Sequence, residues 1–583
     1  MALWSALALL SLSRAVLSFI PTMSAWSLNL HRFLPPVAAW LPWSIATLGL
    51  VPAIARRLTP GLDRAGSWIA SAPAVSTLVW ATGAALLVFT TPDQARFVGD
   101  FILRESTLRE HLAGTTWYPQ ALPLDLLIHE RFARWIMDVL TMDPNGAGRL
   151  IGAVEAAMLG ALAVQFVRVL QLRGAMAFAA ASILFWGGYL TLFTGYNKAF
   201  SEMCLMTAAV GVFGLDVVRR GRGLSMLGIT LSIALLLHRS ALGLLPAACV
   251  AGAIWLRTHD GGRGWRRREF IVASGLPLVV LILMAPRLIT IVTQIDPMHF
   301  APETVRRSGL LATTFGGGRT TDMSNLLVML SPFAILLPLL AALGTRPHAR
   351  EALVVGALAL PFVLVVPLIH PGQGYIRDWD DFASAGVALS LATAWLAAGA
   401  LRATRSSLWL ATSLTLGVAA PSLQWMLHGG DLDRALTRAE AFMKEPPPRS
   451  TMERYTTWGY IGERAASTGR LERSAGAYAE AARAIASPHI LHQWAMIEVQ
   501  RGNFTGARSI YSRLVQRNPR DVFAWWMLAG ACSQLEDWDE AYHATRQVLA
   551  LDPAHVGARQ ALADMERTRP GIVRPPPTKI VEK

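Results

Sequence analysis

Long apolar runs restrict the fold of this chain more than any other feature of its sequence. They recur through the first 430 or so positions, and each is about 17 to 22 residues long, enough for an α-helix to cross a hydrocarbon core about 30 Å thick. Roughly the last 150 residues contain no such run. The composition, 53 % hydrophobic and only 16 % charged, excludes an ordinary soluble assembly. We therefore predict an all-α chain in which a polytopic transmembrane bundle precedes a soluble helical region.

Counting the apolar runs predicts about 13 membrane crossings. They are placed near residues 3–20, 34–55, 73–91, 150–171, 175–193, 202–218, 222–238, 240–256, 270–292, 326–344, 352–369, 383–400 and 407–427. The first run is interpreted as a helix rather than a signal peptide, because it lacks a basic n-region and a small-residue cleavage site. The three cysteines indicate neither a disulfide framework nor a zinc site.

The net charge of +14 is explained by topology rather than by nucleic-acid binding. Arginines cluster in short connectors that alternate correctly as cytoplasmic loops: Arg56, Arg57 and Arg64; Arg173; Arg219, Arg220 and Arg222; Arg257, Arg263 and Arg266 to Arg268; Arg346 and Arg350; Arg402 and Arg405. The opposite, extracytoplasmic side then carries the loops 92–149, 194–201, 294–325 and 370–382, together with the whole C-terminal region. The predicted location is a multi-pass inner membrane, of bacterial type.

The C-terminal region repeats with a period of 34 residues. Gly502, Phe504, Ala507, Tyr511, Leu514 and Pro519 are matched by Glu536, Trp538, Ala541, Thr545, Val548 and Pro553. This spacing resembles a tetratricopeptide repeat, and three repeats are predicted, the first degenerate. Such an α-solenoid has no chemistry of its own but offers a surface to a protein partner.

The predicted domains follow from these shifts. They are N-terminal transmembrane helices (1–72), a main transmembrane domain with a large loop at 92–149 (73–427), a linker (428–450), the repeats (451–567) and a disordered tail (568–583).

The loop 92–149 is too long for a mere connector. Between Pro123 and Val139 the apolar residues fall on one helical face, with Asp125 and His129 largely opposite. This pattern predicts a helix lying in the membrane interface, where it would hold a lipid headgroup over the membrane.

Asp100 is the predicted catalytic acid of this loop. It follows the crossing that ends at Thr90-Thr91-Pro92, so it lies near the apolar boundary. Desolvation there raises the basicity of a carboxylate towards that needed to take a proton from an alcohol. The alternative is a solvated acid or an N-cap for the helix that begins at Phe101.

Two basic residues on the same side stand out, and the first, Lys198, is suited to bind a phosphate as a point charge. Lys198 is the only lysine among the first 443 residues and stands between two apolar runs, where a charge is costly without partners. The alternative is an exposed lysine paired with Glu202. Arg239 lies in the tight turn between two apolar runs, and the junction of these two runs is predicted to form the wall of a cavity. The alternative is a snorkelling arginine between two tilted helices.

The stretch 370–382 holds Arg377, Asp378, Asp380 and Asp381. In an extended segment Asp378 and Asp380 would face one metal ion or one set of sugar hydroxyls, whereas in a helix they would diverge. A solvated, N-capping cluster is the alternative. The cofactor is unknown from the sequence, with a divalent cation as one option.

Together these residues resemble the GT-C class of polytopic glycosyltransferases, which use a lipid-linked sugar donor and have a catalytic acid in the first large extracytoplasmic loop. Asp100 matches the loop acid, and Tyr118-Pro119 with Pro123-Leu124 is similar to the class's proline-bearing segment. The Asp378 to Asp380 stretch and the turn ending at Lys198 resemble positions in bacterial members with tetratricopeptide tails. Two extra spans before the loop, and the lack of an adjacent acidic pair in it, depart from the pattern and leave metal dependence open.

The resemblance implies inverting transfer of a sugar from a polyprenyl phosphate to an acceptor hydroxyl. Asp100 would be the general base, and Lys198, with Arg239 or Arg377, would stabilise the leaving phosphate. Asp378 and Asp380 would orient the donor sugar or hold a cation, and Tyr118 would contact the substrate. The repeats would bind the acceptor or another protein.

Two other classes of function compete with this one. A membrane-anchored scaffold would use the repeats to recruit envelope-assembly enzymes, and Asp100→Asn would then be silent. A transporter or polymer ligase would use the buried turn and the acids as a solute path, but no inverted repeat supports it.

Overall fold

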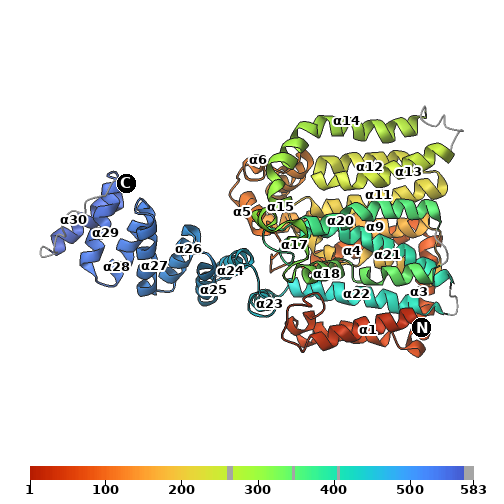
Figure 1. Ribbon diagram of the computed structural model, residues 1–583, viewed down its shortest axis with the longest axis horizontal. Helices are drawn as coiled ribbons and strands as arrows, with labels where there is room; N and C mark the ends of the chain where they lie inside the picture. Colours follow the sequence, from red (N-terminus) through yellow and green to blue (C-terminus); the bar gives the residue numbers. More distant parts are fainter. Residues whose placement is uncertain (259–266, 345–347, 404–406, 570–583) are drawn as a thin grey trace. The chain divides into compact units, whose positions relative to one another are not determined.

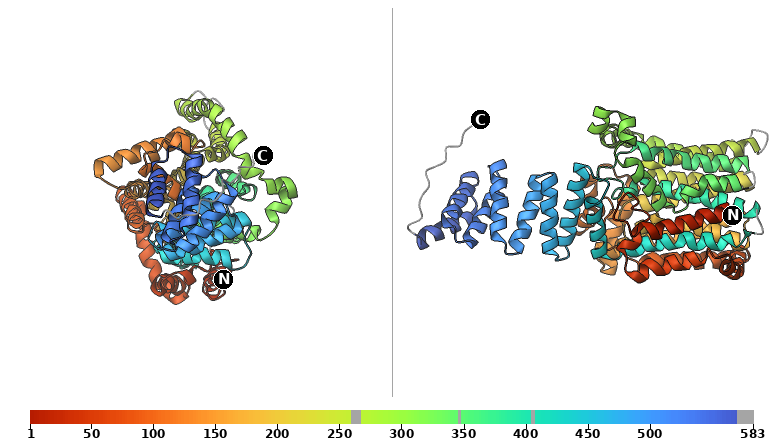
Figure 2. Two further views of the ribbon diagram at one scale, coloured as in Figure 1. Left: turned by 90° about the vertical axis from the view of Figure 1, so that its left-hand side faces the viewer. Right: turned by 60° about the horizontal axis from the view of Figure 1, so that its bottom comes forward.

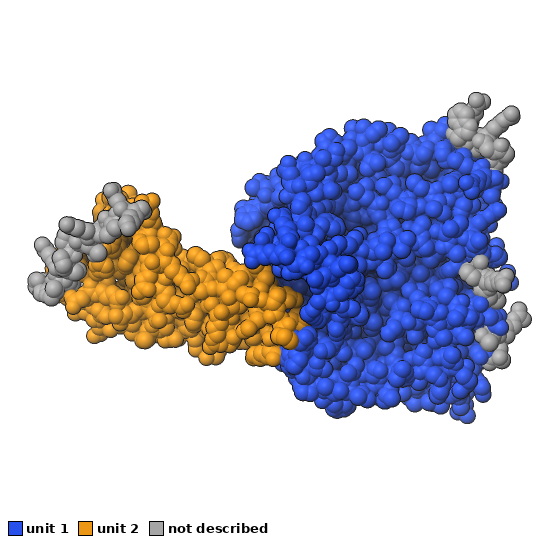
Figure 3. Space-filling view, viewed as in Figure 1, with its two compact units in different colours: residues 1–438, 445–447 blue, residues 439–444, 448–583 orange. Residues whose placement is uncertain are grey.

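The computed structural model describes residues 1–258, 267–344, 348–403 and 407–569. Within these ranges the chain is all-helical and has no β-strand, as predicted. It divides into two units, coloured separately in Figure 3: unit 1 comprises residues 1–438 and 445–447, and unit 2 comprises 439–444 and the chain from 448 onward. Residues 570–583 of the predicted tail 568–583, and parts of three arginine-bearing connectors, lie outside the described residues.

Unit 1 is a bundle of long helices that run side by side with roughly parallel axes (Figure 1). Within the described ranges, seven helical stretches are long and apolar enough to cross a membrane: α4 (Pro73–Thr90), α9 (Pro144–Val169), α11 (Phe200–Arg220), η4 with α13 (Arg239–Thr258), α14 with η7 (Arg268–Ile295), α20 (Ala349–Leu368) and η9 with α21 (Trp379–Ala403). These helices fit a membrane protein.

Three bent helix pairs raise the number of candidate spans in the described residues to at most ten. They are α2 (Pro36–Leu48) with α3 (Pro52–Ser71), α10 (Gly174–Phe185) with η3 (Gly188–Thr194), and α18 (Arg319–Leu330) with α19 (Leu337–Leu343). The predicted count of about 13 is therefore not confirmed. Apolar runs in α1 (Ala2–Leu17) and α12 (Leu224–Leu237) form helices shorter than a full span.

The first bent pair also changes the prediction for residues 56–72. The sequence indicates an arginine-rich connector there, but the chain turns by 90° and continues as the 20-residue helix α3. Ala55, Gly66 and Ile69 are buried on one face of α3, while Arg56 and Arg57 are exposed. An amphipathic helix of this kind buries its small residues against the bundle and keeps its charges outside.

Short helices gather at one end of the bundle, as Figures 1 and 2 show. They come from the predicted loops 92–149 and 294–325: α5 (Phe101–Arg109), α6 (Gly114–Trp117), α7 (Pro123–Leu126), η2 (Leu127–Phe132), α8 (Ala133–Leu140), α15 (Pro297–Phe300), α16 (Glu303–Ser308) and α17 (Leu310–Phe315).

The helical stretch from α7 to α8 has its polar face inside and its apolar face outside. Asp125 is paired with Arg104 at 3.0 Å, and His129 with Glu202 at 2.9 Å, all four being buried. Apolar side chains on the other face are about half exposed: Leu127, Phe132, Trp135 and Val139. Such an arrangement suits a helix whose outer face meets lipid.

Unit 2 is a stack of consecutive helices, seen in side view in Figure 2. After α23 (Leu432–Lys444), which crosses the boundary between the units, the helices are α24 (Thr451–Ala466), α25 (Leu471–Ala484), α26 (Pro488–Gln500), α27 (Phe504–Arg517), α28 (Val522–Gln534), α29 (Trp538–Leu551) and α30 (Val556–Thr568). The repeat positions Ala507 and Ala541 are fully buried, because small residues let neighbouring helices cross closely.

Candidate functional site: a polar cavity in unit 1

A cavity of about 560 Å³ opens among the loops at the end of unit 1 where the short helices of residues 92–149 and 294–325 gather. Its walls come from distant parts of the chain: the start of α5, the turn before α11, η4, the η7–α15 segment, α20 and the stretch that leads into α21. Polar and charged side chains in its lining are Asp100, Gln120, Lys198, His238, Arg239, Ser240, Asp296, His299, Gln373, Asp378, Asp380 and Asp381.

Lys198 is the cation of one end of the cavity. Its ammonium Nζ lies 3.1 Å from Asp100 Oδ2 and 3.7 Å from Asp380 Oδ2. Burial by itself would lower the pKa of Lys198, but the two carboxylates raise it above its ordinary value, so the ammonium stays charged. Glu202, the partner in the alternative prediction, pairs with His129 instead.

Asp100 occupies the N-cap position of α5, but its side chain makes no capping hydrogen bond. It faces Lys198, and this ammonium holds the pKa of Asp100 below its usual range, outweighing the effect of burial. The prediction that desolvation raises the basicity of Asp100 is therefore wrong. The nearby cation, which the sequence could not place, stabilises the charged carboxylate more than burial destabilises it.

Asp380 is the most deeply buried acid of this end, with a side chain that is 1 % exposed. Tyr196, two residues before Lys198, donates a hydrogen bond of 2.6 Å to Asp380 Oδ2. The turn that contains Tyr196 was predicted to be functional because of Lys198, but no role was predicted for the Tyr196 phenol. Nothing in the sequence alone connects it to a residue 184 positions away.

Asp378 and Asp380 do not share one ligand position. The segment 379–382 is the 3₁₀ helix η9, not an extended strand, so the two side chains diverge. Asp378 Oδ2 accepts a hydrogen bond from the backbone N–H of Gln373 at 2.8 Å, and burial, with Asp381 and Asp380 nearby, raises its pKa well above the ordinary value. In the described part of the chain no group of three or more His, Cys, Asp or Glu side chains is arranged to hold a metal ion.

Arg377 and Tyr118 lie outside the cavity lining. Arg377 packs on the Phe97 ring and its carbonyl accepts a hydrogen bond from Gly99 N–H at 2.9 Å, so it ties the loop 97–100 to the loop before η9. Tyr118 is buried under the Arg104 guanidinium and hydrogen-bonds Thr107 at 2.6 Å. Both residues therefore support the walls of the cavity, whereas the sequence predicted that they contact the substrate.

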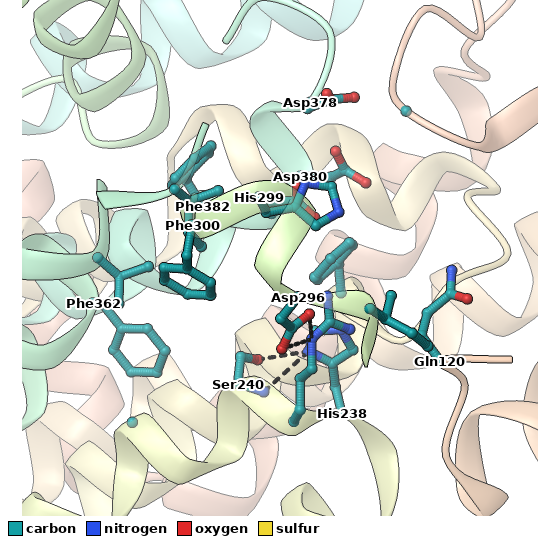
Figure 4. Close-up of a pocket in the computed structure, with 18 of the residues that line it drawn as sticks. Gln120, His238, Ser240, Asp296, His299, Phe300, Phe362, Asp378, Asp380 and Phe382 are labelled. Atoms are coloured by element: carbon teal, nitrogen blue, oxygen red, sulfur yellow. Dashed lines mark hydrogen bonds and ion pairs between the residues drawn. The ribbon is translucent and has the colours of Figure 1, made fainter. Parts of the chain in front are cut away.

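Arg239 is the cation of the opposite end. Its guanidinium lies 2.9 Å from Asp296 and 3.1 Å from His238 Nε2, and Figure 4 shows His238, Ser240 and Asp296 together, away from Asp378 and Asp380. Burial, followed by the charge of Arg239, lowers the pKa of His238 well below its ordinary value, so this imidazole is neutral. Asp296 was missed by sequence reasoning, since a lone acid before a proline carries no distinctive signal.

A phenyl ring separates the two ends. Lys198 Nζ lies 4.6 Å from the centroid of Phe200, and the same ring lies 4.9 Å from His238. Phe300, Phe362 and Phe382 line another wall, as Figure 4 shows. The cavity therefore combines an end rich in carboxylates, an end with an arginine, and apolar walls between them, an arrangement that suits an amphiphilic ligand.

Residues 488–531 match the tetratricopeptide repeat family. The match covers α26, α27 and most of α28 and confirms the repeat predicted there. No curated protein matches the chain closely enough to count as a relative. Since the repeat lies wholly within unit 2, the chemistry of unit 1 has to be argued from its geometry.

Proposed function

We propose that the chain is a membrane glycosyltransferase that moves a sugar from a polyprenyl-phosphate donor to an acceptor hydroxyl. The observation that carries the proposal is that Asp100, Lys198 and Asp380, from three distant segments, meet in one cavity with partly apolar walls. Sequestering charges inside a membrane bundle is costly, so such a meeting point is most simply explained by function.

Each part of the cavity has a task in this reaction. The carboxylate end takes the proton of the acceptor hydroxyl, and Lys198 holds two of its carboxylates in place. The other cation, Arg239, stabilises negative charge on the departing phosphate. The phenyl and aliphatic side chains, among them Phe362 and Val365 of α20, contact the sugar ring and the first prenyl units of the donor.

The remaining features fit the same scheme. The exposed apolar row on η2 and α8 supports a position of the cavity next to the outer leaflet, where the proposed lipid-linked donor would be found. Tetratricopeptide repeats commonly bind other proteins, so unit 2 is proposed to hold the acceptor or a partner enzyme on the extracytoplasmic side of a bacterial inner membrane.

The test is sugar transfer in membrane vesicles that contain the full chain, supplied with a panel of synthetic polyprenyl-phosphate hexoses labelled in the sugar. We expect label to move from lipid to a non-lipid product. Lys198→Met should reduce this at least tenfold. Glu110→Gln, a change to an exposed acid of α5's C-cap, serves as the matched control. Wild-type vesicles that transfer no sugar from any donor would refute the proposal.

The tetratricopeptide match favours one second candidate, a membrane-anchored scaffold that only recruits other proteins. It predicts that cells which depend on the protein tolerate Lys198→Met but not removal of residues 448–583. The glycosyltransferase proposal predicts that neither change is tolerated.

A further inference from the structure

Asp380 has one carboxylate oxygen that is occupied and one that is not. Oδ2 accepts the Tyr196 hydrogen bond and lies 3.7 Å from Lys198 Nζ. Oδ1 is buried and has no hydrogen-bond donor among the described residues. Leaving a buried acceptor without a donor is unfavourable, so a ligand hydroxyl that donates to Oδ1 would remove that cost.

Gly99 leaves space beside this carboxylate. It lines the same cavity, and a Cβ at position 99 would lie 2.9 Å from Asp380 Oδ2 and 3.1 Å from Oδ1. The backbone of Gly99 also has φ +39°, which side-chain-bearing residues rarely adopt. The loop before α5 therefore packs closely against the Asp380 carboxylate, and a side chain at position 99 would collide with it.

The other acids of the cavity are committed elsewhere or more open to water. Asp100 is bonded to Lys198, Asp378 to the Gln373 N–H, and Asp296 to Arg239. Asp381 also lines the cavity but is only partly buried. Asp296 also has a buried oxygen without a hydrogen bond, Oδ1, but that oxygen lies 2.9 Å from Arg239 Nε in an ion pair, whereas the cation beside Asp380, Lys198, lies 3.7 Å from its other oxygen, Oδ2.

From this geometry we infer that Asp380, and not Asp100, is the general base, with Tyr196 as its positioning residue. The inference rests on the proposed transfer. The acceptor O–H bond breaks and its proton goes to Asp380 Oδ1, while the acceptor oxygen bonds to the anomeric carbon from the side opposite the phosphate. The bond between that carbon and the phosphate oxygen breaks, and its electron pair stays on the phosphate.

Transfer assays on four variants in the vesicles described above separate the two acids. Asp380→Asn, which keeps the size of the side chain but cannot take the proton, should lose transfer at least a hundredfold, whereas Asp100→Asn loses about tenfold. Asp380→Glu should recover part of the activity. Tyr196→Phe should lower kcat with little change in KM for the donor, because Tyr196 contacts the base and not the sugar.

Azide provides a readout that does not depend on the acceptor. Azide needs no base, so Asp380→Gly vesicles given sodium azide and labelled donor should form a glycosyl azide of inverted anomeric configuration. Asp100→Gly and Asp381→Gly should not. Because product formation requires a folded protein, it also distinguishes loss of the base from loss of the fold.

Three results would overturn the inference. Azide rescue of Asp100→Gly or Asp381→Gly in place of Asp380→Gly would move the base to that residue and leave the proposed function intact. Asp380→Asn with more than a tenth of wild-type transfer would show that Asp380 is not the base, and it would also leave the proposed function intact. Wild-type vesicles without any sugar transfer would remove both the proposed function and the assignment of its base.

Discussion

At the scale of single residues, Lys198 explains most of the site. One ammonium faces the carboxylates of Asp100 and Asp380, with its own side chain 13 % exposed. Buried charges of this kind contribute little net stability when paired, but each becomes costly when its partner is removed. Lys198 therefore stabilises the charged form of Asp100, whose pKa it holds below the usual range, and lies beside the buried carboxylate of Asp380.

Replacing Lys198 by methionine should destabilise unit 1 by about 3 to 5 kcal/mol, since it leaves two carboxylates without a cation in a buried site. Thermal unfolding of the detergent-solubilised protein measures this as a lower Tm. Lys198→Arg keeps the charge and should retain most of the stability. An unchanged Tm for the methionine variant would show that the ion pairs are not coupled to folding.

At the scale of elements, the loop before α21 is held by the first residue of α18. The Arg319 guanidinium donates to the carbonyl of Ile369 at 2.7 Å, to Tyr375 Oη at 2.7 Å and to His370 Nδ1. His370 N–H in turn donates to the His299 carbonyl at 2.7 Å. These hydrogen bonds of Arg319 and His370, called the Arg319 clamp below, join the loops on two sides of the cavity. They therefore help to set the cavity's shape.

The Arg319 clamp should weaken in acid. Burial, with Arg319 beside it, lowers the pKa of His370 to about 4 from an ordinary 6.5, so the neutral imidazole is the form that the fold favours. This contribution to stability is complete above pH 6.5 and is lost as the pH falls from there through about 4. Hydrogen exchange of residues 370–378, corrected for its intrinsic pH dependence, should become several-fold faster over that interval. His370→Gln keeps an uncharged acceptor and should show a smaller change; an equal change would assign the effect to other groups.

The outer face of α8 leads to a second prediction at this scale. Trp135 is 56 % exposed on the same face as Phe132 and Val139. A cysteine at position 135 labelled with an environment-sensitive fluorophore should show blue-shifted emission in vesicles, since the label would enter the headgroup region. The same label at Arg109, whose side chain is 60 % exposed, is the control and should emit as in water. Equal spectra at both positions would argue against an interfacial helix.

At the scale of the whole molecule, a unit whose long apolar helices fit a membrane protein and a repeat unit share one chain. The first has the cavity and the second has the tetratricopeptide match. Repeats of this kind contact only their neighbours in the stack and bind partners on their surface. The proposed function divides the tasks accordingly, with the chemistry proposed for unit 1 and the recruitment of a protein proposed for unit 2.

This division requires unit 2 and the cavity to face the same side of the membrane. Alkaline phosphatase fused to the C-terminus should be active in bacteria, and green fluorescent protein fused there should be dark, because arginine-rich connectors mark the cytoplasmic side. A fusion in the connector at Arg222 should behave in the opposite way. The reverse pattern would place unit 2 in the cytoplasm and exclude an extracytoplasmic acceptor as its ligand.

The helical class, the division into two regions and the repeat were all predictable from local pattern. Apolar length indicates membrane helices and a 34-residue period indicates tetratricopeptide pairs, since both depend on residues close together in the chain. The number of spans was not predictable in this way. The apolar run predicted at 34–55 bends by 90° between Leu48 and Pro52, and composition does not record the bend.

The order of residues along the chain was enough to identify the side chains that are costly to bury: a single lysine between two apolar runs, an acid after a crossing, and acids before the last spans. The pairing of these side chains depends on the fold. Packing brings Lys198 next to Asp100 and Asp380, and this lysine lowers the pKa of Asp100. Packing also pairs Arg239 with Asp296. The physical reason is that the energy of a charge depends on the few ångströms around it, and those neighbours come from segments far apart in the chain.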